Sequence, residues 1–180
     1  MHLSLLQGFM RYLLDYRASF VLSRLPLPVV LATDFDGCLT NDRVYLNREG
    51  EEFVAATRKD GLGSTRIQNL GICLLIVSSE RDAVVTRRGE KMGVEVIQNV
   101  ANKEVALSGY LNKKNISWES VWYLGNDVND LEVIRKANVS LCPIDAAPEI
   151  RKEVDVILPI RGGSGVLNYI ASHLEQRKLF

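Results

Sequence analysis

The stretch Thr33-Asp34-Phe35-Asp36-Gly37-Cys38-Leu39-Thr40 decides the fold class of this chain. It follows residues 29–32, a short apolar run typical of a parallel strand that is buried on both faces. Two carboxylates separated by one residue therefore leave a strand end together, and Gly37 allows the chain to turn sharply there. Ligands of open parallel sheets bind outside the carboxyl ends of the strands, so we expect the chemistry at this edge.

Apolar runs alternate with helical patterns along the rest of the chain. Further strands are expected at residues 72–77 and 121–124, with weaker signals at 94–97, 139–142 and 154–158. Helices are expected between the strands, at residues 63–70, 81–92, 102–115, 129–136 and 165–176. This alternation predicts an α/β fold with a Rossmann-like, doubly wound parallel sheet.

One segment breaks the alternation directly after the first strand. Residues 44–47 and 52–55 flank Arg48-Glu49-Gly50-Glu51, which predicts a short β-hairpin where a helix would be expected. A hairpin of this length cannot form a domain of its own. We therefore expect it to lean over the site or to pair with another subunit.

The composition excludes several classes of function. The 180 residues suit one ordinary domain, and 47% hydrophobic with 24% charged residues excludes a disordered chain. Lys plus Arg and Asp plus Glu both number 22, so the net charge points to neither nucleic acid nor an anionic membrane. Three scattered cysteines are too few for a disulfide framework or a thiolate zinc site, which predicts a reduced, cytoplasmic protein.

An N-terminal segment, residues 1–27, precedes the main domain at residues 28–180. Apolar residues at positions 3, 6, 10, 13 and 14 predict an amphipathic helix, which Pro26 and Pro28 close off. Charged residues interrupt its apolar run, so a membrane span is not expected. We expect this helix to dock on the body or to face another subunit; a surface for a different partner or for a membrane is the alternative.

Three further polar groups lie at predicted strand ends or helix starts. Ser78 follows the strand at 72–77, Lys103 lies near a helix start, and Gly125-Asn126-Asp127-Val128-Asn129-Asp130 follows the strand at 121–124. Carboxylates gathered at one edge would repel one another unless a divalent cation such as Mg²⁺, which prefers oxygen ligands and shares phosphate oxygens, lies among them. A hydroxyl and an ammonium group add donors for a phosphoryl group. This inventory predicts phosphoryl transfer.

In their order along the chain, these residues resemble the four motifs of the haloacid dehalogenase superfamily of phosphohydrolases. The resemblance covers roughly residues 28–175. It implies that Asp34 is the nucleophile, which forms an aspartyl-phosphate, and that Asp36 is the general acid and base. It also implies that Ser78 and Lys103 hold the phosphoryl group.

The implied Mg²⁺ site departs from the family pattern at one position. The resemblance assigns the ion to Asp34, Asp36 and the residue at 126, with Asp127 and Asp130 behind them. Relatives usually carry Asp where this chain has Asn126. An amide oxygen still coordinates a cation, but the lost charge removes on the order of a few kcal/mol of attraction at an effective dielectric near 20. Rotation of Asp127 into the site is an alternative.

The short hairpin in place of a large cap is similar to one subgroup of this superfamily, the capless sugar-acid phosphatases. These act on 3-deoxy-octulosonate 8-phosphate or on the 9-phosphates of nonulosonates, the sialic acid type. Lys59-Asp60-Gly61 and Arg161-Gly162-Gly163-Ser164-Gly165 are similar to segments of this subgroup. The resemblance further implies a homotetramer whose hairpins assemble together, with each site completed by a neighbouring subunit.

Ser78-Ser79-Glu80-Arg81, with Arg88 and Lys91, is similar to the nonulosonate branch. This likeness implies that the sugar acid is bound by five residues: Lys59, Ser79, Glu80, Arg88 and Lys91. Arg88 and Lys91 are three residues apart and so share one helical face, for which a solvated surface is the alternative interpretation.

A second relative suggests a different function. Cys38-Leu39-Thr40-Asn41 and Leu124-Gly125-Asn126 are similar to the phosphatase-like C-terminal domain of some CMP-sialic acid synthetases. That domain can lack phosphatase activity and serve in tetramer assembly or regulation. Because Asp34 is retained, we favour an active enzyme and keep the inactive assembly module as the alternative.

Overall fold

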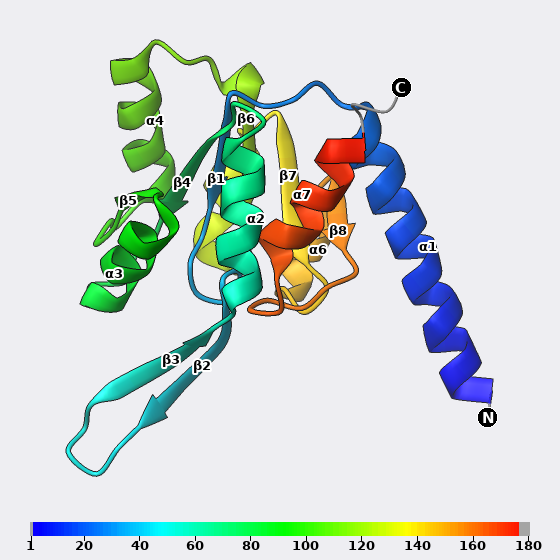
Figure 1. Ribbon diagram of the computed structural model, residues 1–180, viewed down its shortest axis with the longest axis horizontal. Helices are drawn as coiled ribbons and strands as arrows, with labels where there is room; N and C mark the ends of the chain where they lie inside the picture. Colours follow the sequence, from blue (N-terminus) through cyan, green and yellow to red (C-terminus); the bar gives the residue numbers. More distant parts are fainter. Residues whose placement is uncertain (1, 177–180) are drawn as a thin grey trace.

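The computed structural model describes residues 2–176, with side chains from residue 8 onward except that of residue 11. Six parallel strands form one sheet in the order β5-β4-β1-β6-β7-β8 (Figure 1). The strands are β1 Val30–Thr33, β4 Cys73–Val77, β5 Glu95–Ile97, β6 Val121–Leu124, β7 Val139–Pro143 and β8 Val156–Leu158. The predicted α/β class with a doubly wound parallel sheet is confirmed.

Helices cover both faces of the sheet (Figure 1). One face carries α1 His2–Arg24, α2 Arg58–Gln68, α3 Ala83–Met92 and α7 Val166–Gln176. The other carries α4 Lys103–Lys114, α5 Leu131–Ile134 and α6 Pro148–Glu153. Each face encloses its own core, because alternate side chains of a strand point to opposite sides: Leu31 belongs to the first core, and Val30 and Ala32 to the second.

Capping residues explain where the helices near the site begin. Thr57 accepts the backbone N–H of Lys59, so α2 begins at Arg58, five residues before the predicted start. Asn102 caps α4 by accepting the N–H of Val105, which places Lys103 at the first position of the helix. The short helix α6 was not predicted. Its six residues are too few to establish a helical period in the sequence.

The predicted hairpin is present as β2 Thr40–Leu46 and β3 Glu52–Ala56, an antiparallel pair that projects from the carboxyl edge of the sheet (Figure 1). Most of its side chains are exposed, including four large apolar ones: Val44, Tyr45, Leu46 and Phe53. Val54 packs against the core at the base of the hairpin.

Helix α1 packs on β8 and α7. Ala18 and Leu22 are buried in this contact, and the Tyr169 hydroxyl donates to Asp15 at 2.6 Å. The apolar residues from which the helix was predicted contribute little to this contact: Met10 and Leu13 are exposed and Leu14 is half-buried, and the side chains at positions 3 and 6 lie outside the described residues. Within residues 2–176, no helix has the length and apolar character needed to cross a membrane.

Candidate active site

The candidate site lies where the strand order reverses, with β1 between β4 and β6. Asp34 directly follows β1, and its N–H donates to the carbonyl oxygen of Leu124 in β6 at 2.9 Å. Ser78 directly follows β4, and its N–H donates to the carbonyl oxygen of Ile97 at 2.9 Å. These bonds extend the sheet by one residue past the strands. The first, second and fourth motifs therefore start from one edge of the sheet.

Lys103 connects the third motif to this edge. Its Nζ lies 2.8 Å from Oδ2 of Asp34 and 2.8 Å from Oδ1 of Asp130. None of the three side chains is more than 8% exposed. The lysine therefore forms a buried bridge between the predicted nucleophile and a carboxylate of the fourth motif.

Asp130 anchors this bridge and the loop that follows β6. Its Oδ1 also accepts the Tyr123 hydroxyl at 2.6 Å. Its Oδ2 accepts the backbone N–H groups of Asn126 at 2.9 Å and Asp127 at 3.2 Å. Asp127 itself is exposed and caps the short 3-10 turn Val128–Asp130. Asp130 thus positions Lys103 and Asn126, while Asp127 shapes the loop at its surface.

Burial sets the protonation of the central groups. It raises the pKa of Asp34 to about 7; the negative charge of Asp130 adds to this, and the Lys103 ammonium opposes it. Burial disfavours the ammonium form of Lys103, but the two carboxylates more than offset this, and its pKa is raised. Lys103 is therefore positively charged at neutral pH.

Asp36 lies partly exposed beside the buried pair. Its Oδ1 accepts the Thr40 hydroxyl at 3.0 Å, and Thr40 Oγ1 in turn accepts the backbone N–H of Gly37 at 3.2 Å. Burial raises the pKa of Asp36, and the negative charges of Glu80 and Asp42 raise it further, although the Thr40 hydrogen bond opposes them. A raised pKa favours the protonated form that a general acid needs.

Three oxygen atoms, from Asp34, Asp36 and Asn126, lie close together at the site. The amide oxygen of Asn126 lies 3.1 Å from Oδ2 of Asp34 and 2.9 Å from the backbone carbonyl oxygen of Asp36. Adjacent ligands of an octahedral Mg²⁺ at about 2.1 Å are separated by about 3.0 Å, so these two spacings are compatible with the ion. The opposite amide orientation lets the Asn126 nitrogen donate to the same two oxygens. Asn126 can therefore serve this cluster with a cation or without one.

This oxygen set is not a cluster of acidic side chains. Among the described residues, no group of three His, Cys, Asp or Glu side chains is arranged to hold a metal. The cluster instead combines one carboxylate, one amide and one backbone carbonyl, from Asp34, Asn126 and Asp36. Residues 34, 36 and 126 are those that the resemblance assigned to Mg²⁺, with Asp36 contributing through its backbone.

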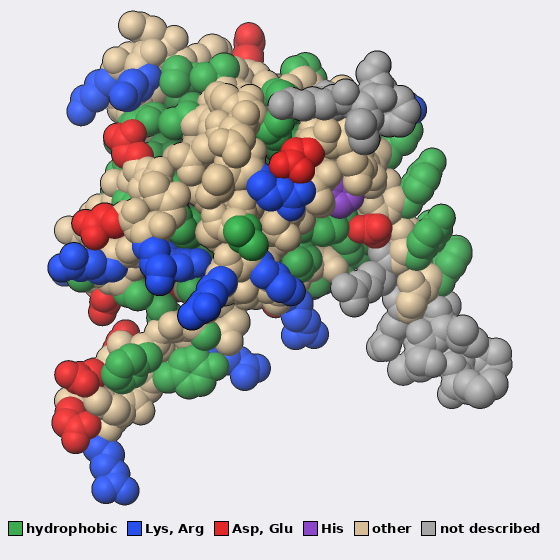
Figure 2. Space-filling view, in the orientation of Figure 1, with side chains coloured by type: hydrophobic (Ala, Val, Ile, Leu, Met, Phe, Trp, Pro, Cys, Tyr) green, Lys and Arg blue, Asp and Glu red, His purple; other side chains and the backbone are tan. Residues whose placement is uncertain are grey.

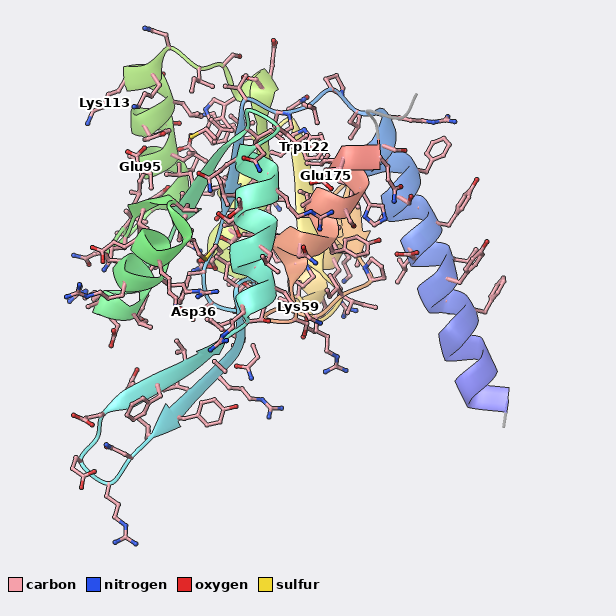
Figure 3. All side chains as sticks on the ribbon, viewed as in Figure 1. Asp36, Lys59, Glu95, Lys113, Trp122 and Glu175 are labelled. Atoms are coloured by element: carbon pink, nitrogen blue, oxygen red, sulfur yellow. The ribbon has the colours of Figure 1, made fainter. Side chains whose placement is uncertain are left out.

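The residues expected to bind the sugar acid lie in two places. Asp36 and Glu80 line a small cavity of about 50 Å³ together with residues of the hairpin and α3. Ser79 and Lys59 are exposed, and Figure 3 shows both Lys59 and Asp36 at the end of the molecule from which the hairpin projects. The Lys59 stem packs against Gly165, where an added Cβ would lie 2.9 Å from that of Lys59.

Arg88 and Lys91 line a different cavity, of about 540 Å³, between α2 and α3. Arg58 adds a third positive charge to its lining, and Figure 2 shows basic side chains gathered over this part of the molecule. The Arg88 guanidinium donates to the carbonyl oxygen of Thr57 at 2.6 Å. Within one chain, the structure therefore does not bring Arg88 and Lys91 into the cavity of Asp36.

Sequence reasoning missed three residues that hold the site together. Thr40 orients Asp36, Tyr123 holds Asp130, and Asp60 accepts the N–H of Leu167 at 2.8 Å and so ties α2 to α7. Thr40 and Asp60 lie in two of the segments quoted in the sequence analysis, but the sequence pattern indicated no function for either side chain. Tyr123 gave no signal, because it lies inside an apolar strand.

A buried lysine between the carboxylates of Asp34 and Asp130, at the carboxyl edge of a parallel sheet, is the kind of site expected of a phosphoryl-transferring enzyme. Comparison with known proteins specifies the family. The haloacid dehalogenase-like hydrolase family matches residues 75–170, and the chain belongs to this family. It is a phosphoric monoester hydrolase.

Relatives and solved structures agree with this assignment. The chain is 31% identical over 146 residues to a 3-deoxy-D-manno-octulosonate 8-phosphate phosphatase of Salmonella typhi, covering 81% of this chain and 78% of the relative. The crystal structure of a haloacid dehalogenase (HAD) family hydrolase from Streptomyces avermitilis superposes on this chain with a TM-score of 0.82 and 32% sequence identity. The match covers 87% of this chain and 92% of that one. A second crystal structure is that of a 3-deoxy-D-manno-octulosonate (KDO) 8-phosphate phosphatase from Moraxella catarrhalis in complex with magnesium, phosphate and KDO. It has a TM-score of 0.81 and 28% sequence identity, and the match covers 88% of this chain and 91% of that one.

Proposed function

We propose that this protein is a Mg²⁺-dependent phosphatase that releases inorganic phosphate from a phosphorylated 2-keto-3-deoxy sugar acid. The substrate is octulosonate 8-phosphate or a nonulosonate (sialic acid type) 9-phosphate. The observation that carries the proposal is Lys103, held 2.8 Å from Asp34 and 2.8 Å from Asp130 beside Asp36. The named relatives support the octulosonate ester, and Glu80, Arg88 and Lys91 support the nonulosonate ester.

In the first step, the Asp34 carboxylate attacks phosphorus and forms an aspartyl-phosphate as the ester P–O bond breaks. Asp36 donates its proton to the leaving sugar oxygen. Lys103 holds a phosphoryl oxygen by its positive charge, and the Ser78 hydroxyl donates to another. When bound at the oxygens of Asp34, Asp36 and Asn126, Mg²⁺ supplies further positive charge beside the phosphoryl group.

In the second step, Asp36 reverses its role. It takes a proton from water, which attacks phosphorus, and the bond between phosphorus and the Asp34 oxygen breaks. Inorganic phosphate leaves, and Asp34 returns to its carboxylate form. The raised pKa of Asp36 supports this cycle, because it makes the protonated form that the first step needs easier to populate.

A neighbouring subunit of a homotetramer completes each site under this proposal. The cavity at Asp36 is lined by the acidic side chains of Asp36, Glu52, Glu80 and Asp82, so the positive charge that an anionic sugar acid needs must come from elsewhere. The basic cavity of Arg58, Arg88 and Lys91 lies elsewhere on the same chain and is available to the substrate of another copy. The free state of Cys38, Cys73 and Cys142 supports the further proposal of a cytoplasmic location.

The experiment is phosphate release from a panel of sugar-acid phosphates with added Mg²⁺, comparing wild type with Asp34→Asn. The asparagine retains Oδ1, which accepts the Phe35 N–H at 2.7 Å, so the fold should persist while turnover is lost. Release by wild type from the octulosonate or a nonulosonate ester, and none by the variant, is expected. Activity retained by a folded Asp34→Asn variant would overturn the nucleophile assignment.

The second candidate function is an inactive module for tetramer assembly or regulation of sialic acid activation. Asn126 favours it, because the amide removes a charge from the oxygen cluster and can hydrogen-bond to that cluster without a cation. Failure to release phosphate from any ester, by a correctly assembled tetramer that binds Mg²⁺, would support this function over the first.

A further inference from the structure

Helix α1 exposes an apolar face on the side opposite its contact with the body. Six large apolar side chains lie there, between 43% exposed (Leu13) and 65% exposed (Tyr12). We call this set the outer α1 face: Phe9, Met10, Tyr12, Leu13, Tyr16 and Phe20. Figure 3 shows ring side chains along α1 that point away from the sheet. Ala18 and Leu22, on the inner side, are fully buried.

The spacing on this face matches that of a helix that pairs with another helix. Phe9, Leu13, Tyr16 and Phe20 are separated by four, three and four residues, the pattern of the apolar seam in a coiled coil. In the sequence, Leu6 continues the pattern towards the N-terminus. Since this chain itself carries a helix with that spacing, we infer that the outer α1 face binds α1 of a second copy of the same chain.

The size of the face suits such a pair. Aromatic side chains bury roughly 200 Å² each, so the exposed parts of the four rings, with Leu13 and Met10, amount to about 600 Å² per copy. Two copies would then bury about 1,200 Å², which reaches the range of stable interfaces between proteins. An isologous pair needs only this one surface, because each copy offers the same face to the other.

The composition of the face favours a protein partner over a membrane surface. Phe, Tyr, Met and Arg are enriched in the centres of protein interfaces, whereas Lys and Glu are depleted. Arg24 stacks on the ring of Phe20 at 4.0 Å, and α1 contains no Lys or Glu. A helix lying in a membrane interface needs a charged face opposite its apolar one. In α1, that opposite side carries Ala18 and Leu22 and packs on the body.

The test is the solution mass of the full chain, measured by light scattering or sedimentation equilibrium. Leu13→Glu and Tyr16→Glu place a charge in the centre of the seam and should reduce the mass of the assembly at least twofold at the same concentration. Val105→Glu is the matched control, because Val105 is 63% exposed on α4, away from α1. Its mass should equal that of wild type.

Two further measurements keep the outcome unambiguous. Circular dichroism should be unchanged in the α1 variants, and a folded variant with wild-type mass would overturn the inference. Wild type is also mixed with phosphatidylcholine–phosphatidylserine vesicles. Binding that Tyr16→Glu abolishes, with no change in protein mass, would assign the outer α1 face to a membrane instead and overturn the self-pairing.

Discussion

Gly37 and Asn126 occupy adjoining space in the active site: a Cβ on Gly37 would lie 1.9 Å from Nδ2 of Asn126. Gly37 also has a φ of +70°, a conformation that side chains rarely adopt. Gly37, which lies between the pair Asp34 and Asp36 and Thr40, must meet both requirements. The turn after β1 therefore admits only glycine at this position.

Gly37→Ala should abolish phosphate release and lower the free energy of unfolding by several kcal/mol, because the new methyl group displaces Asn126 from the oxygen cluster. Gly50→Ala is the control. Gly50 has a φ of +82° but nothing within 4 Å of an added Cβ, so only backbone strain of about 1–2 kcal/mol is expected. Chemical denaturation and activity assays separate the two. Equal losses in both variants would contradict the contact with Asn126.

Lys103→Met should destabilise the protein by about 3–5 kcal/mol, because it leaves Asp34 and Asp130 buried without a compensating charge. Adding Asp130→Asn should restore part of this loss in urea denaturation, since one of the two unpaired carboxylates is removed. Arg135→Met breaks an exposed ion pair with Glu153 and should change little. If Lys103→Met and Arg135→Met were equally stable, the bridge would have no structural role.

Asn126→Asp should tighten Mg²⁺ binding roughly tenfold or more, because the added charge lies in the oxygen cluster. Without metal, the same variant should melt at a lower temperature than wild type, since the introduced carboxylate would face that of Asp34 with no proton donor between them. Thermal unfolding in EDTA and in a Mg²⁺ titration measures both effects without an activity assay. Asn129→Asp adds the same charge at an exposed position of the same loop and should match wild type.

Asp60 should make stability depend on pH. Burial raises its pKa to about 6 from an ordinary value of 3.8, so the folded state binds more protons than the unfolded state between these values. The contribution of Asp60 to stability therefore falls as the pH rises from about 4 to about 6. Asp60→Asn keeps an oxygen for the Leu167 N–H and removes this dependence. Its free energy of unfolding relative to wild type should rise by about 1–3 kcal/mol between pH 4 and pH 7.

The chain's local patterns were sufficient to predict the sheet and the motifs. Each motif follows a short apolar strand, and parallel strands of one sheet present their carboxyl ends at one edge, so Asp34, Ser78 and Asn126 could be placed together. The hairpin could be predicted because two short strand-like segments flank the turn Arg48-Glu49-Gly50-Glu51.

Other features depend on packing that no local pattern encodes. Tyr123 holds Asp130 through a hydroxyl that the sequence presents only as part of an apolar strand. Arg88 and Lys91 share a helical face, as their spacing indicates, but that face lines a cavity apart from Asp36. In α1 the positions that dock could not be identified, because both sides of the helix carry apolar residues.

The strand order β5-β4-β1-β6-β7-β8 places the three strands that end in motifs of the candidate site at or next to the centre of the sheet. Strands at the rim open most readily, and interior ones exchange their amide hydrogens only when the whole domain unfolds. Fraying at β8 would therefore leave the spacing of Asp34, Ser78 and Asn126 undisturbed, whereas fraying at β5 would free the Ser78 N–H from the carbonyl oxygen of Ile97. The positions of Asp34 and Asn126 are tied to the global stability of the fold, and Ser78 is the member of the site most exposed to local opening.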